Sequence, residues 1–203
     1  MRRLRETNIN SPEDTNKKYK WLGLDEPSES EQAKRMQMVE GLEEGMKVVE
    51  LGCGISSFCQ TLKDKFPNCE VHALDFGGDI IERLKINYPQ IKYKRGDATK
   101  TPYEDNYFDY VVAGELIEHI PDPEDLVKEM YRICKDGGVI SISTPFLERM
   151  WRPNDIPAEH LWEFNRDDML GLFGKYGETK TRFFIDKVGV GGIHMVVNCI
   201  CKK

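Results

Sequence analysis

The sequence has little that would anchor it in a membrane or cross-link it. No run approaches the ~18 apolar residues that a membrane-spanning helix needs, and the opening MRRLRETNIN lacks the apolar core of a secretory signal. The six cysteines form no CxxC pair and have no histidine at metal-ligand spacing. We therefore expect a cytoplasmic protein with reduced, mostly buried thiols, no membrane span and no metal site.

An excess of positive charge is also absent. The chain has 29 basic and 35 acidic residues and a net charge of -6, which disfavours a broad surface for nucleic acid while leaving room for a local basic patch. Its 203 residues are 39% hydrophobic, enough for one well-packed core without disulfide or metal staples. The composition favours a single enzyme-sized domain, and it does not indicate an oligomeric state.

What the sequence does contain is an alternation of strands and helices. Short apolar runs rich in β-branched residues predict buried strands, and apolar residues at helical spacing predict the helices between them. Such an order favours an α/β fold, a doubly wound Rossmann-like sheet that is mostly parallel, with its ligand cleft at the carboxyl ends of the strands. Strands are predicted at 46–51, 69–75, 91–94, 108–113 and 139–143, helices at 56–66, 79–88 and 123–134, and a turn at 136–138.

The last third of the chain has a different pattern. Residues 178–186 and 193–201 both have strand character, and the glycine-rich VGVGG that joins them is typical of a hairpin. A helix over 167–176, with Asn165 as its cap, precedes this pair. Together with the five earlier strands, the hairpin predicts a seven-stranded sheet with an antiparallel C-terminal end.

Two segments lie outside this regular alternation. Residues 1–27 form a polar N-terminal arm whose apolar cluster, near Trp21, either anchors the arm on the domain or closes it over a ligand as a lid. A helix that begins near Ser28 opens the single domain of residues 28–203. Residues 146–165 form an insertion that is too long for a plain connection, which indicates a function on the acceptor side.

Four acidic residues stand at or just after the carboxyl ends of successive strands: Glu50, Asp75, Asp97 and Glu115. The turn Gly52-Cys53-Gly54 after the first strand allows a close backbone approach to a ligand. Asp75 has the spacing to accept two ribose hydroxyls, Asp97 could accept from an adenine amine, and Glu50 could face an ammonium group.

Three stretches together resemble a known family. VVELGCG, VHALD and GDATKTPYEDNYFDYVVAGELIEHIPDPEDLVKEMYRICKDGGVISISTP resemble the ordered motifs of class I S-adenosylmethionine (SAM)-dependent methyltransferases, over roughly residues 46–145. The small-molecule branch resembling ubiquinone-pathway O-methyltransferases is the most similar. The resemblance implies SAM as cofactor, S-adenosylhomocysteine as product, and cofactor contacts from Glu50, Gly52, Cys53, Gly54, Asp75, Phe76, Asp97, Ala98, Gly114 and Glu115. The sequence departs from the family at Ile55-Ser56-Ser57, where a third glycine is common.

The methyl acceptor is less defined than the cofactor. No DPPY-like or NPPY-like tetrad follows the fourth strand, so methylation of an amide or base nitrogen is disfavoured, and the resemblance implies a small-molecule acceptor, by default a hydroxyl. An alcohol needs a general base. His160, with Glu159, is a candidate to orient or deprotonate the acceptor, beside an apolar wall of Phe146, Trp151 and Trp162; His160 could equally cap the following helix. His119 either faces the reacting centre or fixes the loop before Pro121, while His72 is expected to be structural and His194 is undecided.

Two other functions fit parts of the same pattern. A nicotinamide-dependent oxidoreductase also has glycines after its first strand and an acidic residue after its second. Its motif, however, includes a third glycine, and it would leave Asp97 without a role. A non-catalytic or regulatory SAM-binding module would keep the fold and lose the reaction. Binding of SAM, or of nicotinamide dinucleotides, distinguishes these alternatives.

Overall fold

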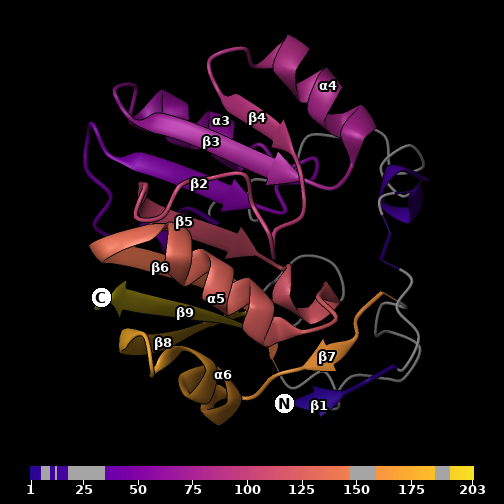
Figure 1. Cartoon of the computed structure of the whole chain (residues 1–203), viewed down its shortest axis with the longest axis vertical. Coiled ribbons are helices and arrows are strands. Elements are labelled where there is room, and N and C mark those ends of the chain that lie inside the picture. The colour runs from indigo at the N-terminus through magenta and orange to yellow at the C-terminus, as the bar shows by residue number, and fades with distance from the viewer. Residues whose placement is uncertain (6–9, 12, 18–34, 147–158, 186–192) are drawn as a thin grey trace.

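A seven-stranded sheet forms the centre of the molecule. The computed structural model describes residues 1–5, 10–11, 13–17, 35–146, 159–185 and 193–203. Its strands lie in the order β4-β3-β2-β5-β6-β9-β8 (Figure 1). The first five of these strands pair in parallel, and β9 pairs antiparallel with both β6 and β8. The predicted Rossmann-like sheet with a reversed C-terminal hairpin is thus confirmed. The strands are β2 (Lys47–Leu51), β3 (Glu70–Asp75), β4 (Lys92–Arg95), β5 (Phe108–Gly114), β6 (Cys134–Phe146), β8 (Gly177–Ile185) and β9 (Ile193–Cys201).

Apolar residues on both faces of the sheet explain why helices cover each face. Val48 of β2 packs into one core cluster while its neighbour Val49 packs into the other, since successive strand residues point to opposite faces. One cluster joins the sheet to α5 (Pro123–Ile133) and α6 (Arg166–Phe173), which lie in front of the sheet in Figure 1. The other cluster joins the sheet to α3 (Phe58–Lys65), α4 (Gly78–Asn87) and the short helix η1 (Gln37–Val39).

The helices begin and end close to the predicted positions. Asp122 caps α5, which has a proline in its first turn, and Asn165 caps α6 as predicted, accepting a hydrogen bond from the Asp168 amide at 2.9 Å. Ile86, although it is an apolar residue of α4, does not pack in the core. Its side chain is 79% exposed, because it lies on the outer face of α4.

Strand β6 is longer than predicted. The turn expected at 136–138 lies within the strand, where the β5–β6 pairing is irregular between Phe108 and Tyr110. Gly137 absorbs this irregularity with a φ of +72°, a conformation that glycine adopts without strain.

Part of the N-terminal arm is ordered against the acceptor-side insertion. Strand β1 (Arg2–Arg3) pairs antiparallel with β7 (Trp162–Glu163), and the Leu4 amide donates to the Leu161 carbonyl at 2.7 Å. Asn16, in a helical turn over residues 13–17, accepts from the Asp79 amide at the start of α4. The described parts of the arm therefore follow the carboxyl edge of the parallel strands, on the right of Figure 1. The predicted helix start at Ser28, the cluster at Trp21, Trp151 and the VGVGG link lie outside the described residues.

All six cysteines are buried and carry free thiols, as predicted. They are Cys53, Cys59, Cys69, Cys134, Cys199 and Cys201. Within the described residues, no helix is long and apolar enough to cross a membrane.

Candidate active site

The turn after β2 brings the backbone close to the carboxyl edge of the sheet. Gly52 and Gly54 have φ angles of +69° and +51°, which side chains disfavour. A Cβ atom on Gly52 would also lie 2.7 Å from the Leu116 Cδ1 atom. The Gly52 and Cys53 amides donate to the Leu74 carbonyl of β3 at 2.8 and 3.1 Å, which fixes the turn between the two strands.

A buried carboxyl and an arginine meet beside this turn. Glu50 is 1% exposed, and its two oxygens accept hydrogen bonds from the Arg35 guanidinium and from the Cys59 thiol. Burial raises the pKa of Glu50 from 4.5 to about 7, although the Arg35 charge acts in the opposite direction. Gly114, at the end of β5, lies beside this arginine, and a Cβ there would be in ordinary contact with the Arg35 guanidinium carbon at 3.5 Å.

Arg35 is a site residue that the sequence did not indicate. It comes from the segment before η1, and no glycine or acidic pattern marks it. The only available signal was chemical: an amino acid that binds as a ligand carries a carboxylate, and a carboxylate needs a positively charged partner. Arg35 and Glu50 place a positive and a negative group side by side at this edge of the sheet.

Asp75 lies at the end of β3 with both carboxylate oxygens oriented by backbone amides. Gly54 donates to Oδ2 at 2.8 Å and Gly77 donates to Oδ1 at 2.7 Å. Its side chain is buried, and Phe76 next to it is half-buried. A carboxylate oxygen accepts more than one hydrogen bond, so this arrangement is compatible with ribose hydroxyls as additional donors.

Asp97 and Ala98 follow β4 at the same edge of the sheet. The Thr99 amide and hydroxyl both donate to Asp97 Oδ1 at 2.8 Å, which holds the half-buried carboxylate in place. Ala98 is buried beside it. The two residues lie one strand further from the glycine turn than Asp75, which is the order expected along an extended nucleoside.

Glu115 has an unusual backbone and is firmly held. Its φ is +53°, a conformation that few non-glycine residues adopt. Ser143 donates to Glu115 Oε1 at 2.7 Å, and His194 Nδ1 lies 2.9 Å from Oε2. His194, undecided from the sequence, is thus a buried partner of a predicted cofactor residue.

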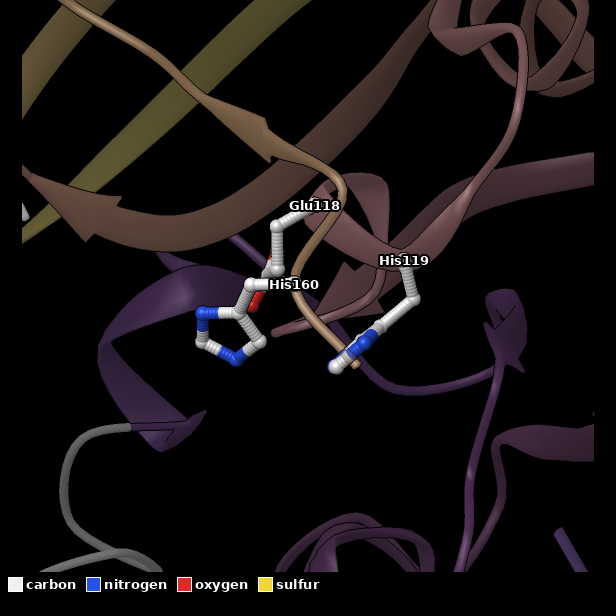
Figure 2. A group of neighbouring side chains, drawn as sticks. All are labelled: Glu118, His119 and His160. Carbon is white, nitrogen blue, oxygen red and sulfur yellow. The ribbon is translucent and has the colours of Figure 1, made fainter. Parts of the chain in front are cut away.

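Beyond Glu115, three side chains converge from two segments (Figure 2). Glu118 and His119 lie on the short helix η2 (Ile117–His119), and His160 lies just before β7. The two imidazole rings meet edge to face at 4.8 Å. The alternative in which His160 caps the following helix is wrong, since Asn165 has that role.

Glu118 in this group is completely buried. Thr144 donates to its Oε2 at 3.0 Å. Burial and the nearby Glu115 carboxylate raise the pKa of Glu118 from 4.5 to about 8, against the opposite effect of His160. The sequence does not mark this residue, because a glutamate between apolar neighbours in a short segment is usually exposed.

The other predicted acceptor-side residues are placed differently. Phe146 packs edge to face on Phe183 at 4.7 Å, and Trp162 donates from Nε1 to the Ile120 carbonyl at 3.0 Å. Glu159 acts through its backbone, with its carbonyl oxygen 3.1 Å from His119 Nδ1. His72 is structural, as predicted, and is buried among three aromatic rings and Glu70.

With this geometry established, the chain can be compared with known proteins. Residues 49–142 match the family model described as "Methyltransferase domain". The similarity to a methyltransferase domain thus covers a little under half of the chain. The matched span contains the glycine turn and all four strand-end acids, so the predicted resemblance to class I methyltransferases is confirmed.

Curated relatives extend the match beyond this span. A demethylmenaquinone methyltransferase of Geobacillus sp. (strain WCH70) is 31% identical over 141 residues, which are 66% of this chain and 58% of that protein. A protein of the same name from Staphylococcus aureus is 34% identical over 111 residues, 53% of this chain and 46% of its own. The chain thus spans about half the length of these relatives.

The chain also has solved structural neighbours. Phosphoethanolamine N-methyltransferase 2 of Haemonchus contortus, in complex with phosphomonomethylethanolamine and S-adenosylhomocysteine, superposes with a TM-score of 0.75 at 15% identity. The match covers 96% of this chain and 61% of that one. At this identity the likeness shows the fold alone.

Proposed function

We propose that the chain transfers the methyl group of SAM to a small-molecule acceptor, with a hydroxyl oxygen as the receiving atom. The observation that carries the proposal is the ion pair between the half-buried Arg35 and the buried Glu50 beside the glycine turn, at the same sheet edge as Asp75. SAM supplies a methyl group already activated on a sulfonium. The protein therefore has to orient two reactants and exclude water.

Each part of the cofactor has a matching group at this edge. Arg35 pairs with the carboxylate of the methionine part, Glu50 attracts its ammonium, and Gly52 lets the backbone approach. Asp75 accepts from the ribose hydroxyls. Phe76, with Asp97 and Ala98 on the next strand, lines the adenine end, while Gly114 and Glu115 lie beside the amino acid end.

The acceptor enters from the side of β7 and η2. His160 is the proposed base that orients or deprotonates the acceptor hydroxyl, and His119 supports it across the 4.8 Å ring contact. Phe146 and Trp162 are fixed by their own contacts and contribute an apolar wall. Such a wall suits an aromatic or lipid-like acceptor better than a highly charged one.

A ring carbon is the second candidate for the receiving atom. It is favoured by the relatives named demethylmenaquinone methyltransferase, because adding a methyl group to such a quinone-pathway compound points to the ring itself. Deprotonation of a ring hydroxyl raises the electron density on both the oxygen and the adjacent ring carbons. The same base at His160 therefore serves either outcome.

Calorimetric binding of S-adenosylhomocysteine tests the cofactor half of the proposal. We expect micromolar affinity for the unaltered chain, a loss of about tenfold to a hundredfold in Asp75→Ala and Arg35→Met, and no binding of nicotinamide dinucleotides. Asp64→Ala and Arg83→Met, on helices away from the strand ends, are the matched controls. Equal affinity in all variants would contradict the assigned cofactor site.

Turnover tests the acceptor half. The chain is incubated with SAM carrying a labelled methyl group and a metabolite extract, and labelled products are identified by mass spectrometry. Nuclear magnetic resonance of the product shows whether the new methyl carbon is bonded to oxygen or to carbon. Cofactor binding without any labelled product would favour the non-catalytic alternative, and full turnover in His160→Ala would exclude the histidine as base.

A further inference from the structure

The group of Glu118, His119 and His160 has the composition of a metal site. Each residue offers one ligand atom, and these atoms all lie within 4.8 Å of one another. Figure 2 shows the three side chains pointing toward one another from η2 and from the segment before β7. Two imidazoles and one carboxylate form a common ligand set for zinc and for other divalent transition metals.

Backbone contacts hold the two segments together and so preorganise the group. The Leu161 amide donates to the Glu118 carbonyl at 2.7 Å, next to His160 in the chain. The Trp162 indole donates to the Ile120 carbonyl at 3.0 Å, on the other side of η2. Because these bonds flank the three side chains, the group does not depend on mobile surface loops.

The carboxyl group of Glu118 is buried and only partly hydrogen-bonded. Its side chain is 0% exposed, and Oε1 has no hydrogen-bond partner among the residues that the structure describes. The other oxygen accepts a hydrogen bond from the neutral Thr144 hydroxyl. A fully buried carboxylate oxygen without a partner is costly, so it is expected to bind a proton or a cation.

His119 is oriented as metal-binding histidines usually are. Its Nδ1 lies 3.1 Å from the Glu159 carbonyl, and a carbonyl can only accept, so Nδ1 carries the proton and Nε2 is the ligand atom. The Asn10 amide donates to the carbonyls of both His119 and Glu159, at 2.9 and 3.0 Å. Asn10 of the N-terminal arm thus links the two segments that carry His119 and His160.

From these observations we infer that Glu118, His119 and His160 bind one divalent transition metal ion, with zinc as the first candidate. In a tetrahedral site, metal–ligand bonds of about 2.0–2.2 Å separate two ligand atoms by about 3.4 Å. The ligand atoms of the group lie within 4.8 Å of one another, so the widest separation has to shorten by up to about 1.4 Å when an ion binds. The expectation of no metal site rested on the lack of cysteine and histidine at metal-ligand spacing, a criterion that does not cover a glutamate with two histidines from separate segments.

Three protein ligands leave a coordination position for the methyl acceptor, and this part of the inference rests on the proposed function. An acceptor hydroxyl bound there releases its proton to water more readily, since the cation stabilises the oxyanion. The oxygen–methyl bond then forms as the sulfonium–methyl bond breaks, and S-adenosylhomocysteine leaves as a neutral thioether. In this arrangement His160 acts as a ligand, and the metal replaces it as the activating group.

Zinc binding to the full chain, purified without a histidine tag, tests the inference. We expect calorimetry with zinc chloride to show one ion per chain, and cobalt(II) to give the visible absorption of a low-coordinate site. Glu118→Gln and His160→Ala should each lower zinc affinity about a hundredfold or more. His72→Gln is the matched control, because His72 is also a buried histidine beside a glutamate but lies in β3.

Binding of S-adenosylhomocysteine is measured on every variant and separates the possible outcomes. A variant that loses zinc but binds S-adenosylhomocysteine normally is folded and supports the metal site. Equal zinc affinity in all proteins, or methyl transfer that persists unchanged with a chelator, would overturn the metal inference and leave the proposed function standing. Zinc binding without any affinity for S-adenosylhomocysteine would support the metal site and overturn the proposed function.

Discussion

Glu50 makes the stability of the protein depend on pH near neutrality. Its pKa is about 7 in the folded protein and 4.5 as a free side chain, mainly because burial disfavours the charged form. The folded protein therefore holds this proton more tightly than the unfolded chain. The stabilisation is complete below about pH 4.5 and is lost as the pH rises to about 7.

We predict that Glu50→Gln flattens this part of the stability profile. Chemical denaturation between pH 4.5 and 8, without cofactor, should show the unaltered protein losing about 3 kcal/mol more than the variant. Glu70→Gln is the matched control, because the pKa of Glu70 is shifted in the opposite direction, to about 2, mainly by its hydrogen bond with Lys92. The stabilisation from Glu70 is therefore lost only in acid. Parallel profiles for Glu50→Gln and the unaltered protein would contradict the prediction.

Single residues differ in how far the sequence predicts them. Glu50 and Asp75 were predictable, because a carboxylate that ends a buried strand stands out against its apolar neighbours. Arg35 and His194 were not, because each reaches the site from a distant segment and its role exists only after folding. Glu118 had no signal either, since its burial depends on how η2 packs against β6 and on the segment before β7.

Among the elements, the pairing of β1 with β7 is the one that sequence patterns cannot show. Two-residue strands have no periodicity, so Arg2–Arg3 reads as part of a polar arm. The pairing brings the arm across the carboxyl edge of the sheet, and the predicted role as a lid stays a prediction. The longer strands and helices were predictable, because each carries several apolar residues at a regular spacing.

Leu4→Pro tests whether the arm acts as a lid. The change removes the amide that donates to Leu161, so we expect a loss of only about 1 kcal/mol in stability and a faster release of S-adenosylhomocysteine. Stopped-flow dissociation measures the rate, with Leu4→Ala as the control that keeps the amide. An unchanged release rate would mean that the arm only anchors itself on the domain.

At the scale of the whole molecule, the alternation of strands and helices was enough to predict the architecture. Parallel strands need crossover helices, right-handed crossovers leave few topologies, and the hairpin fixes the reversed end. The side chains of the acceptor side were not predictable by the same reasoning, because the insertion over residues 146–165, with its two prolines, has no repeating pattern.

Ligand binding should stabilise the whole domain if the cofactor site is as proposed. S-adenosylhomocysteine at about 100 times its Kd should add about 2.7 kcal/mol. For a chain of this size, that corresponds to a rise in Tm of about 5–10 °C in differential scanning calorimetry. Nicotinamide dinucleotide at the same concentration is the control, and an equal rise with both compounds would contradict a specific SAM site.

The six buried cysteines allow local unfolding of the protein to be followed by thiol labelling. Cys53, Cys59 and Cys69 lie in the core half that contains α3 and α4, and Cys134, Cys199 and Cys201 lie in the half that contains α5 and α6. A thiol reagent can reach them only when the surrounding half opens. Site-resolved labelling rates would therefore show whether the two halves open together as one cooperative unit or whether one half opens alone.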